Sequence, residues 1–144
     1  MISYRRSVTV AVPAETAFDF VVDPSKLSQW SPEVVASTVV GGGEVGVGTV
    51  LRQTRRQGKR EMSSDVAVIV HDRPARHTVR TKVFGVEATF AFSFASRGEQ
   101  TDVTMEATVV GRWLGRLFEG PMARLMEKAD DQALQRLKDA LEKG

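Results

Sequence analysis

Residues 7–30 read SVTVAVPAETAFDFVVDPSKLSQW, and this stretch predicts a strand followed by two helices. Valine at positions 8, 10 and 12 alternates with small or polar residues, which is the two-residue period of a strand with one apolar face. Pro13 suits the first position of a helix, because its fixed φ is helical and its missing N–H would have no helical partner there. Asp23-Pro24 then ends this helix and caps a second, short one that closes at Trp30.

Between Glu33 and Val110 the chain has the pattern of consecutive strands. Segments rich in valine, threonine and phenylalanine are separated by glycine-containing or Asp-Arg-Pro turns. The predicted strands are residues 33–40, 49–57, 59–71, 76–83, 86–95 and 101–110. Such short connections favour antiparallel hairpins over crossover helices. Together with the first strand, they predict a curved, seven-stranded antiparallel sheet.

From Trp113 onward the apolar period becomes helical. Gly115, Gly120 and Pro121 predict an irregular start, with a regular helix from about Pro121. A single long helix would be the element that covers the apolar face of the sheet. The predicted buried stripe consists of Leu114, Leu117, Phe118, Pro121, Met122, Leu125, Met126, Ala129, Ala133, Leu137, Ala140 and Leu141.

Three segments together resemble the START-like superfamily, also called SRPBCC, and most closely its polyketide cyclase/dehydrase branch. They are VTVAVPAETAFDFVVDPSKLSQWSPEV at residues 8–34, GVGT at residues 46–49, and the C-terminal LQRLKDALEKG. The resemblance covers the whole chain as a single START-like domain, residues 1–144. It implies an α+β helix-grip fold, in which a curved seven-stranded antiparallel sheet wraps a long C-terminal helix and two short helices follow strand 1. It also implies a cavity between sheet and helix, and its members bind lipids, hormones and polyketides.

Composition narrows the classes of function. A chain of 144 residues has the length of one domain with one core. The net charge of +2, from 20 basic and 18 acidic residues, is too small to indicate a nucleic-acid-binding protein. The absence of cysteine excludes disulfides, thiolate catalysis and cysteine-ligated metals. No apolar run approaches the ~18 residues of a membrane span, and no signal segment is recognised at Met1, so a cytoplasmic location is expected.

Strand alternation and the helical stripe predict the lining of the cavity. Phenylalanine and methionine suit an adaptable apolar pocket, although each residue on its own could equally fill the core. Trp30 and Trp113 are expected at the rim, for Trp30 because the resemblance implies a tryptophan near the cavity entrance. The predicted ligand-binding residues are Trp30, Val66, Val68, Val70, Phe90, Phe92, Phe94, Met105, Ala107, Trp113, Leu117, Phe118, Met122, Leu125 and Met126.

One set of polar residues crowds a single predicted hairpin. It consists of Arg52, Arg55, Arg56, Lys59 and Arg60, and alternation places Arg55 on the opposite face from Arg52 and Arg56. A solvated hairpin, recognition of a ligand anion at the cavity mouth and nucleic-acid binding remain open for this hairpin. Nucleic-acid binding lacks the interleaved aromatic residues that stack on bases.

The glycine-rich residues 41–48 lack the lysine of a phosphate-binding loop and precede a strand, so a hairpin with positive φ angles is expected. His71 and His77 flank the Asp-Arg-Pro turn and are expected near a strand end on the surface, where neither would be essential for function. With no third ligand they do not predict a metal site. No Ser/His/Asp arrangement with a nucleophile elbow is recognised, so the catalytic residues are unknown.

Three functions follow as hypotheses. The first is a carrier or sensor of a small apolar molecule, the second an enzyme that cyclises or dehydrates a polyketide-like or aromatic substrate, and the third a module that docks an apolar protein segment. Polar groups in the cavity would favour the enzyme, and a large exposed apolar patch would favour the docking module. The expected partner is a small apolar molecule, with no nucleic acid, no membrane span and no cofactor. The ligand, any reaction and the oligomeric state stay open at this point.

Overall fold

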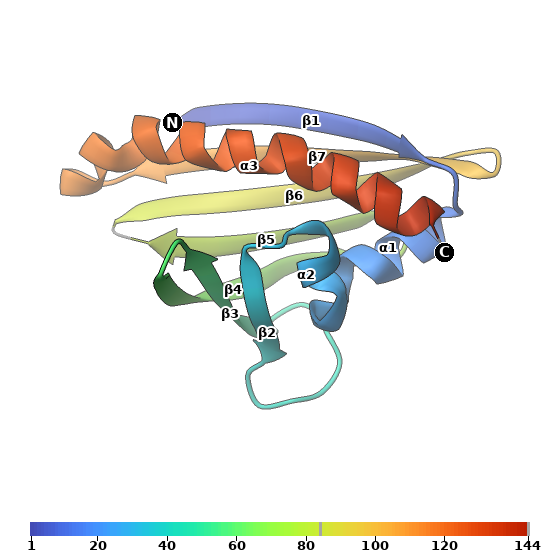
Figure 1. Ribbon diagram of the computed structural model, residues 1–144, viewed down its shortest axis with the longest axis horizontal. Coiled ribbons are helices and arrows are strands. Elements are labelled where there is room, and N and C mark those ends of the chain that lie inside the picture. The colour runs from blue at the N-terminus through green and yellow to red at the C-terminus, as the bar shows by residue number, and fades with distance from the viewer. Residues whose placement is uncertain (84, 144) are drawn as a thin grey trace.

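The computed structural model describes residues 1–83 and 85–143. Within these residues, seven strands form one antiparallel sheet in the order β1-β7-β6-β5-β4-β3-β2, and a long helix lies across it (Figure 1). This confirms the predicted helix-grip fold. The elements are β1 (Ile2–Val10), α1 (Ala14–Val22), the 3₁₀ helix η1 (Pro24–Lys26), α2 (Leu27–Trp30), β2 (Val34–Val39), β3 (Val50–Gln57), β4 (Arg60–Asp72), β5 (Arg76–Val83), β6 (Val86–Arg97), β7 (Gln100–Gly111), the 3₁₀ helix η2 (Trp113–Gly115) and α3 (Arg116–Glu142).

The stretch that predicted the fold forms the expected strand and helices. α1 begins directly after Pro13 and buries one side, formed by Ala14, Ala17, Phe18 and Val21. The Asp23 carboxylate accepts a hydrogen bond from the backbone N–H of Ser25 (2.9 Å) and so caps η1, whose first residue is Pro24. Between β2 and β3, Gly41, Gly42, Gly43 and Gly48 have positive φ, as expected of the glycine-rich hairpin.

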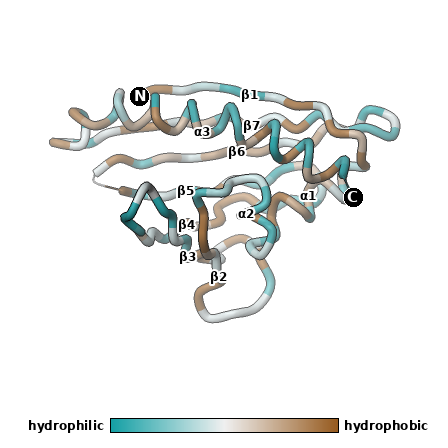
Figure 2. The backbone as a smooth tube through the Cα atoms, in the orientation of Figure 1, coloured by the Kyte–Doolittle hydropathy of each residue, from teal (hydrophilic) through white to brown (hydrophobic). Residues whose placement is uncertain are grey.

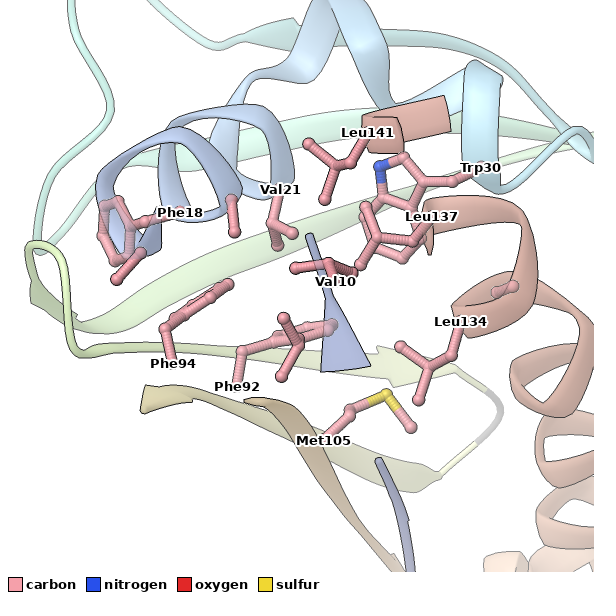
Figure 3. Close-up of a cluster of buried hydrophobic side chains, with 14 of the residues drawn as sticks. Val10, Phe18, Val21, Trp30, Phe92, Phe94, Met105, Leu134, Leu137 and Leu141 are labelled. Carbon is pink, nitrogen blue, oxygen red and sulfur yellow. The ribbon is translucent and has the colours of Figure 1, made fainter. Parts of the chain in front are cut away.

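The core lies between the sheet and the helices. Figure 3 shows side chains from α1, α2, α3 and the sheet converging, among them Phe18, Trp30, Phe92 and Leu137. Phe18 and Leu137 are fully buried, and the Trp30 ring meets the Phe92 ring edge-on at 6.1 Å between centroids. The two short helices and the C-terminal half of α3 therefore share one core.

α3 differs from the sequence prediction in its start. It begins at Arg116 rather than near Pro121, and Pro121 lies inside it. Pro121 is the sixth residue of the helix, just beyond the four whose N–H groups have no partner within it, so it removes one helical hydrogen bond. Hydrophilic and hydrophobic residues alternate along the helix (Figure 2), which runs over β1 and β7 (Figure 1). No helix among the described residues is long and apolar enough to cross a bilayer.

The predicted stripe of α3 is buried mainly in its C-terminal half, whereas in the N-terminal half only Met122 and Met126 of the predicted residues are partly buried. The buried positions are Ala123, Ala133, Leu134, Leu137 and Leu141. Leu117, Phe118, Leu125 and Ala129 are exposed. Because α3 lies over the β1–β7 side of the sheet, a broad apolar stripe cannot all face strands, and its outer part is left in solvent.

Substitutions on α3 test this orientation. Ala133→Trp is expected to lower the free energy of unfolding by roughly 1–3 kcal/mol, because a buried position has no room for an indole. Ala129→Trp and Lys128→Ala change exposed positions and should alter it by less than ~0.5 kcal/mol. Thermal melts compare the three variants. Equal destabilisation by the two tryptophans would contradict the described helix orientation.

Candidate functional site

The face of the sheet that α1, α2 and α3 cover, called the helix face below, carries an apolar row across five strands. Directly opposed residues in an antiparallel sheet point to the same face, so the register identifies this row. Its members, from β4 through β5, β6 and β7 to β1, are Val68, Val79, Phe90, Ala107 and Tyr4. Val68 and Ala107 are fully buried, whereas Val79 and Phe90 are only partly buried.

Arg55 brings a charge to this face from β3. Its guanidinium donates to the Glu33 carboxylate (2.8 Å) and to the Gln53 side-chain oxygen (3.3 Å). The Ser31 hydroxyl donates to the same Glu33 oxygen (2.7 Å), and both Ser31 and Gln53 are buried. On the outer face of the hairpin, Arg52 pairs with Asp65 at 3.0 Å. Arg55 is therefore separated from the solvated charges of the hairpin, as strand alternation predicted.

A partly buried carboxyl on α3 faces the same region. The Tyr4 hydroxyl donates to Asp130 (2.5 Å), and burial raises the pKa of Asp130 to about 6. The hydrogen bond from Tyr4 and the positive charge of Arg55 lower the pKa of Asp130, whereas the charge of Glu33 raises it. Burial, together with the bond to Asp130, raises the pKa of Tyr4. The Asp130 carboxyl thus has a pKa close to neutrality and lies within electrostatic range of Arg55 and Glu33.

Two buried polar atoms have no hydrogen-bond partner among the described residues. They are the indole nitrogen Nε1 of Trp30 and the hydroxyl Oγ of Ser37. Ser37 lies opposite Gln53 in the β2–β3 register and so points to the helix face. Buried polar groups are usually hydrogen-bonded, and an exception commonly marks a place where a water, an ion or a ligand forms the hydrogen bond.

The predicted surface location of the histidines is wrong for His77. His77 is buried, with 4% of its surface exposed, and its Nδ1 lies 3.2 Å from Nδ1 of His71 beneath Phe18. Val68 points to the helix face, so simple alternation along β4 would place His71 on the outer face. The pairing of β4 with β5 shifts between Val68 and Val70, however, and this shift brings the imidazoles of His71 and His77 to the helix face. Burial, and then the charge of His71, lowers the pKa of His77 to about 4. The surface location given as the reason for excluding a functional role therefore does not hold for His77.

The structure brings most of the predicted lining residues to the helix face and leaves others elsewhere. The register shift turns Val70 to the outer face, opposite Thr78. Trp113, Leu117, Phe118 and Leu125 are mainly in solvent, because the N-terminal part of α3 buries little of its apolar surface. The predicted residues that lie on the helix face or on helices beside it are Trp30, Val66, Val68, Phe90, Phe92, Phe94, Met105, Ala107, Met122 and Met126.

Sequence reasoning did not single out the polar members of the site, namely Tyr4, Ser31, Glu33, Ser37 and Asp130. Only Asp130 left a usable signal, because it lies four residues from Met126 and seven from Leu137, at the spacing of the buried side of α3. The positions of the other four residues depend on how strands far apart in the sequence come together, which no local pattern specifies.

Two open depressions mark the described surface, and neither contains the residues of this site. One, of about 550 Å³, is lined by Val110, Gly111, Arg112, Trp113 and Arg116. The other, of about 320 Å³, is lined by Ser7, Val8, Thr9, Arg97, Asp102 and Thr104. The cavity expected between sheet and helix therefore stays a prediction. Within residues 1–83 and 85–143, no three His, Asp or Glu side chains are grouped as a metal site.

The buried imidazole predicts a pH-dependent stability. Because the pKa of His77 is lower in the folded protein, the unfolded chain binds more protons between pH 6.5 and about 4. The contribution of His77 to stability is full above pH 6.5 and is lost as the pH falls to about 4, by roughly 3 kcal/mol. Urea unfolding of the protein and of His77→Phe across this range should show a smaller loss in the variant. Identical pH slopes would contradict a buried, neutral His77, and matching slopes above pH 6.5 serve as the control.

Comparison with known proteins agrees with this architecture. No curated protein matches the chain in sequence. Similar solved structures include TTHA0849 from Thermus thermophilus (18% identity, 97% of each chain, TM-score 0.76), Ara h 8.0201 (12%, 99% of each chain, 0.80) and the Zhui aromatase/cyclase from Streptomyces sp. R1128 (16%, 98% of this chain and 93% of that one, 0.78). At these identities the likeness shows the fold alone. A family model described as polyketide cyclase / dehydrase and lipid transport matches residues 1–142, and the chain therefore belongs to that family of START-like proteins.

Proposed function

We propose that this protein binds a small, largely apolar molecule at the helix face, with an oxygen-bearing end of the ligand beside Arg55. The observation that carries the proposal is two unpartnered buried atoms, Nε1 of Trp30 on α2 and Oγ of Ser37 on the helix face. Leaving a buried donor unpaired costs about 1–3 kcal/mol. A ligand oxygen that accepts from these groups would recover this free energy on binding.

The surrounding side chains support a ligand with a polar end and an apolar body. Arg55 offers donors for a carboxylate or carbonyl oxygen, and its partner Glu33 holds it in place. Phe90 and Val79 lie opposite each other on the helix face, stay partly exposed and offer apolar contact. The family description, which names both polyketide chemistry and lipid transport, is compatible with such a ligand.

An anionic, apolar fluorescent dye tests this arrangement. A naphthalene sulfonate should bind saturably, and Arg55→Met should weaken binding roughly tenfold or more, because a charge-assisted hydrogen bond is lost. Arg52→Met is the matched control, since this arginine lies on the same strand but faces outward, and it should leave the affinity unchanged.

Two further results bear on the proposal. Ser37→Ala should not destabilise the free protein, since it removes an unpaired hydroxyl, whereas clear destabilisation would mean that Ser37 already has a partner. Absence of saturable dye binding, or equal effects of the two arginine substitutions, would contradict the site. Native mass spectrometry of protein purified from its own host would identify a ligand that copurifies.

A second candidate function is a cyclase or dehydratase, and Asp130 is the observation that favours it. General acid–base catalysis works best when the pKa lies near the working pH, and burial raises the pKa of Asp130 to about 6. A carboxylate in this position could remove a proton from a carbon between two carbonyls of a polyketide-like chain. The resulting carbanion would attack another carbonyl carbon of the same chain, and this new carbon–carbon bond would close the ring. The alkoxide formed would then take up a proton, and loss of water would follow.

One substitution, Asp130→Asn, distinguishes the two proposed functions. If the protein is an enzyme, Asp130→Asn abolishes turnover of a poly-β-ketone thioester but retains dye binding, while Asp131→Asn, which changes the exposed neighbour paired with Arg6, retains both. The rate should rise with pH through about 6, since the base acts in its ionised form. Turnover that persists in Asp130→Asn would exclude this role.

A further inference from the structure

A cluster of exposed apolar side chains lies where β7 runs into α3 through η2. The exposed fractions are 93% for Trp113, 78% for Leu114, 73% for Leu117 and 52% for Phe118. These four residues, called the apolar end below, lie at the end of the molecule where α3 starts and the N-terminus is found (Figure 1). Single exposed apolar residues are common, but four large ones in six positions form a patch that points to an interaction.

The backbone fixes this cluster in its exposed position. Trp113 has φ of 56°, and it is the one described residue other than glycine with a positive φ, a conformation that bulky side chains rarely adopt. The N–H of Arg112 donates to the carbonyl of Gly85 (3.1 Å), and the N–H of Gly115 donates to the carbonyl of Arg112 (2.9 Å). A Cβ atom at Gly115 would lie 2.4 Å from the carbonyl oxygen of Gly85. The turn is therefore packed against Gly85, and the indole of Trp113 is exposed.

Two arginines lie beside the apolar end. Arg112 and Arg116 line, with Trp113, the open depression of about 550 Å³ at its base. Neither arginine takes part in an ion pair among the described residues, and both are exposed. Glu119 is the sole acidic residue from position 107 to position 126. The Glu119 carboxylate accepts a hydrogen bond from the backbone N–H of Gly111 (2.8 Å) and forms an ion pair with the amino group of Met1 (2.7 Å). Its negative charge is therefore already paired.

We propose that the apolar end docks on the surface of an anionic phospholipid bilayer. Trp113, Leu114 and Leu117 would enter the boundary between headgroups and acyl chains, where tryptophan is favoured because one end of its ring is apolar and the other can donate a hydrogen bond. Arg112 and Arg116 would contact lipid phosphates from the depression, since a guanidinium matches the geometry of phosphate oxygens. The proposed contact is attachment to one leaflet, in keeping with the lack of a helix able to span a bilayer in residues 1–83 and 85–143.

A bilayer fits this surface better than a folded protein partner. The apolar end is an outward-pointing turn with two arginines, Arg112 and Arg116, at its base. A protein interface instead needs a complementary pocket around each apolar anchor. A fluid bilayer accepts a protruding tryptophan without such a pocket, and its negative surface attracts the two arginines.

Cosedimentation with vesicles tests the proposal. The protein should bind vesicles of phosphatidylcholine mixed with phosphatidylglycerol, bind those of phosphatidylcholine alone much more weakly, and dissociate as salt is added. Loss of one arginine in Arg112→Gln or Arg116→Gln should lower the partition coefficient roughly fivefold. The double substitution Trp113→Ala and Leu117→Ala should lower it roughly tenfold or more. Arg60→Gln and Val47→Ala, which change an exposed arginine and an exposed valine elsewhere, should have no effect.

Tryptophan fluorescence gives an independent readout, because the chain has two tryptophans and Trp30 is already buried. Anionic vesicles should shift the emission of the protein to shorter wavelength, and Trp113→Phe should abolish this shift. Arg112→Gln, Trp113→Phe and the double substitution change residues of the strained turn, whereas Arg116→Gln, Arg60→Gln and Val47→Ala do not, and circular dichroism melts verify folding of every variant. Absence of binding, equal binding to both vesicle types, or a concentration-dependent dimer disrupted by the same substitutions would each overturn the proposal.

Discussion

Polar contacts tie α3 to the edge strand β1 along much of the helix. The Tyr4 hydroxyl donates to Asp130, Arg6 pairs with Glu127 at 3.0 Å, and the ammonium of Lys138 donates to the carbonyl of Thr9 (2.9 Å). Tyr4 and Arg6 are two residues apart and therefore point to the same face of β1. These contacts hold the helix on the β1–β7 side of the sheet. The rest of the helix face, with Arg55 and Ser37, is consequently not covered by α3.

The helix face combines polar and apolar groups in a way that stability alone does not favour. Asp130 and His77 are ionisable groups whose pKa values burial moves in opposite senses, upward for the carboxyl and downward for the imidazole. Both shifts mean that the neutral form is favoured. Trp30 and Ser37 add two polar atoms without partners. Natural proteins commonly keep such costly groups where a function needs them, and apolar residues of similar size would pack more stably.

Local sequence patterns predicted most of the fold, because its elements are encoded within short segments. The alternation of Phe90, Phe92 and Phe94 specifies a strand with one buried face, and Asp23 with Pro24 specifies a helix start. The face of His71 could not be predicted in this way, since the shift between Val68 and Val70 arises from pairing with β5. The exposure of Leu117 likewise depends on where the helix lies over the sheet, which no pattern within the helix specifies.

The two halves of α3 differ in what holds them. The C-terminal half buries Ala133, Leu134, Leu137 and Leu141, whereas the N-terminal half buries Ala123 and carries Pro121, which cannot donate a helical hydrogen bond. Local opening costs least where few apolar side chains are buried. Amide hydrogens in the first turns of α3 should therefore exchange with solvent through partial unfolding, while those near Leu137 exchange only when the whole protein unfolds. The helix would then behave as two cooperative units, of which the first can fray while the second keeps the core intact.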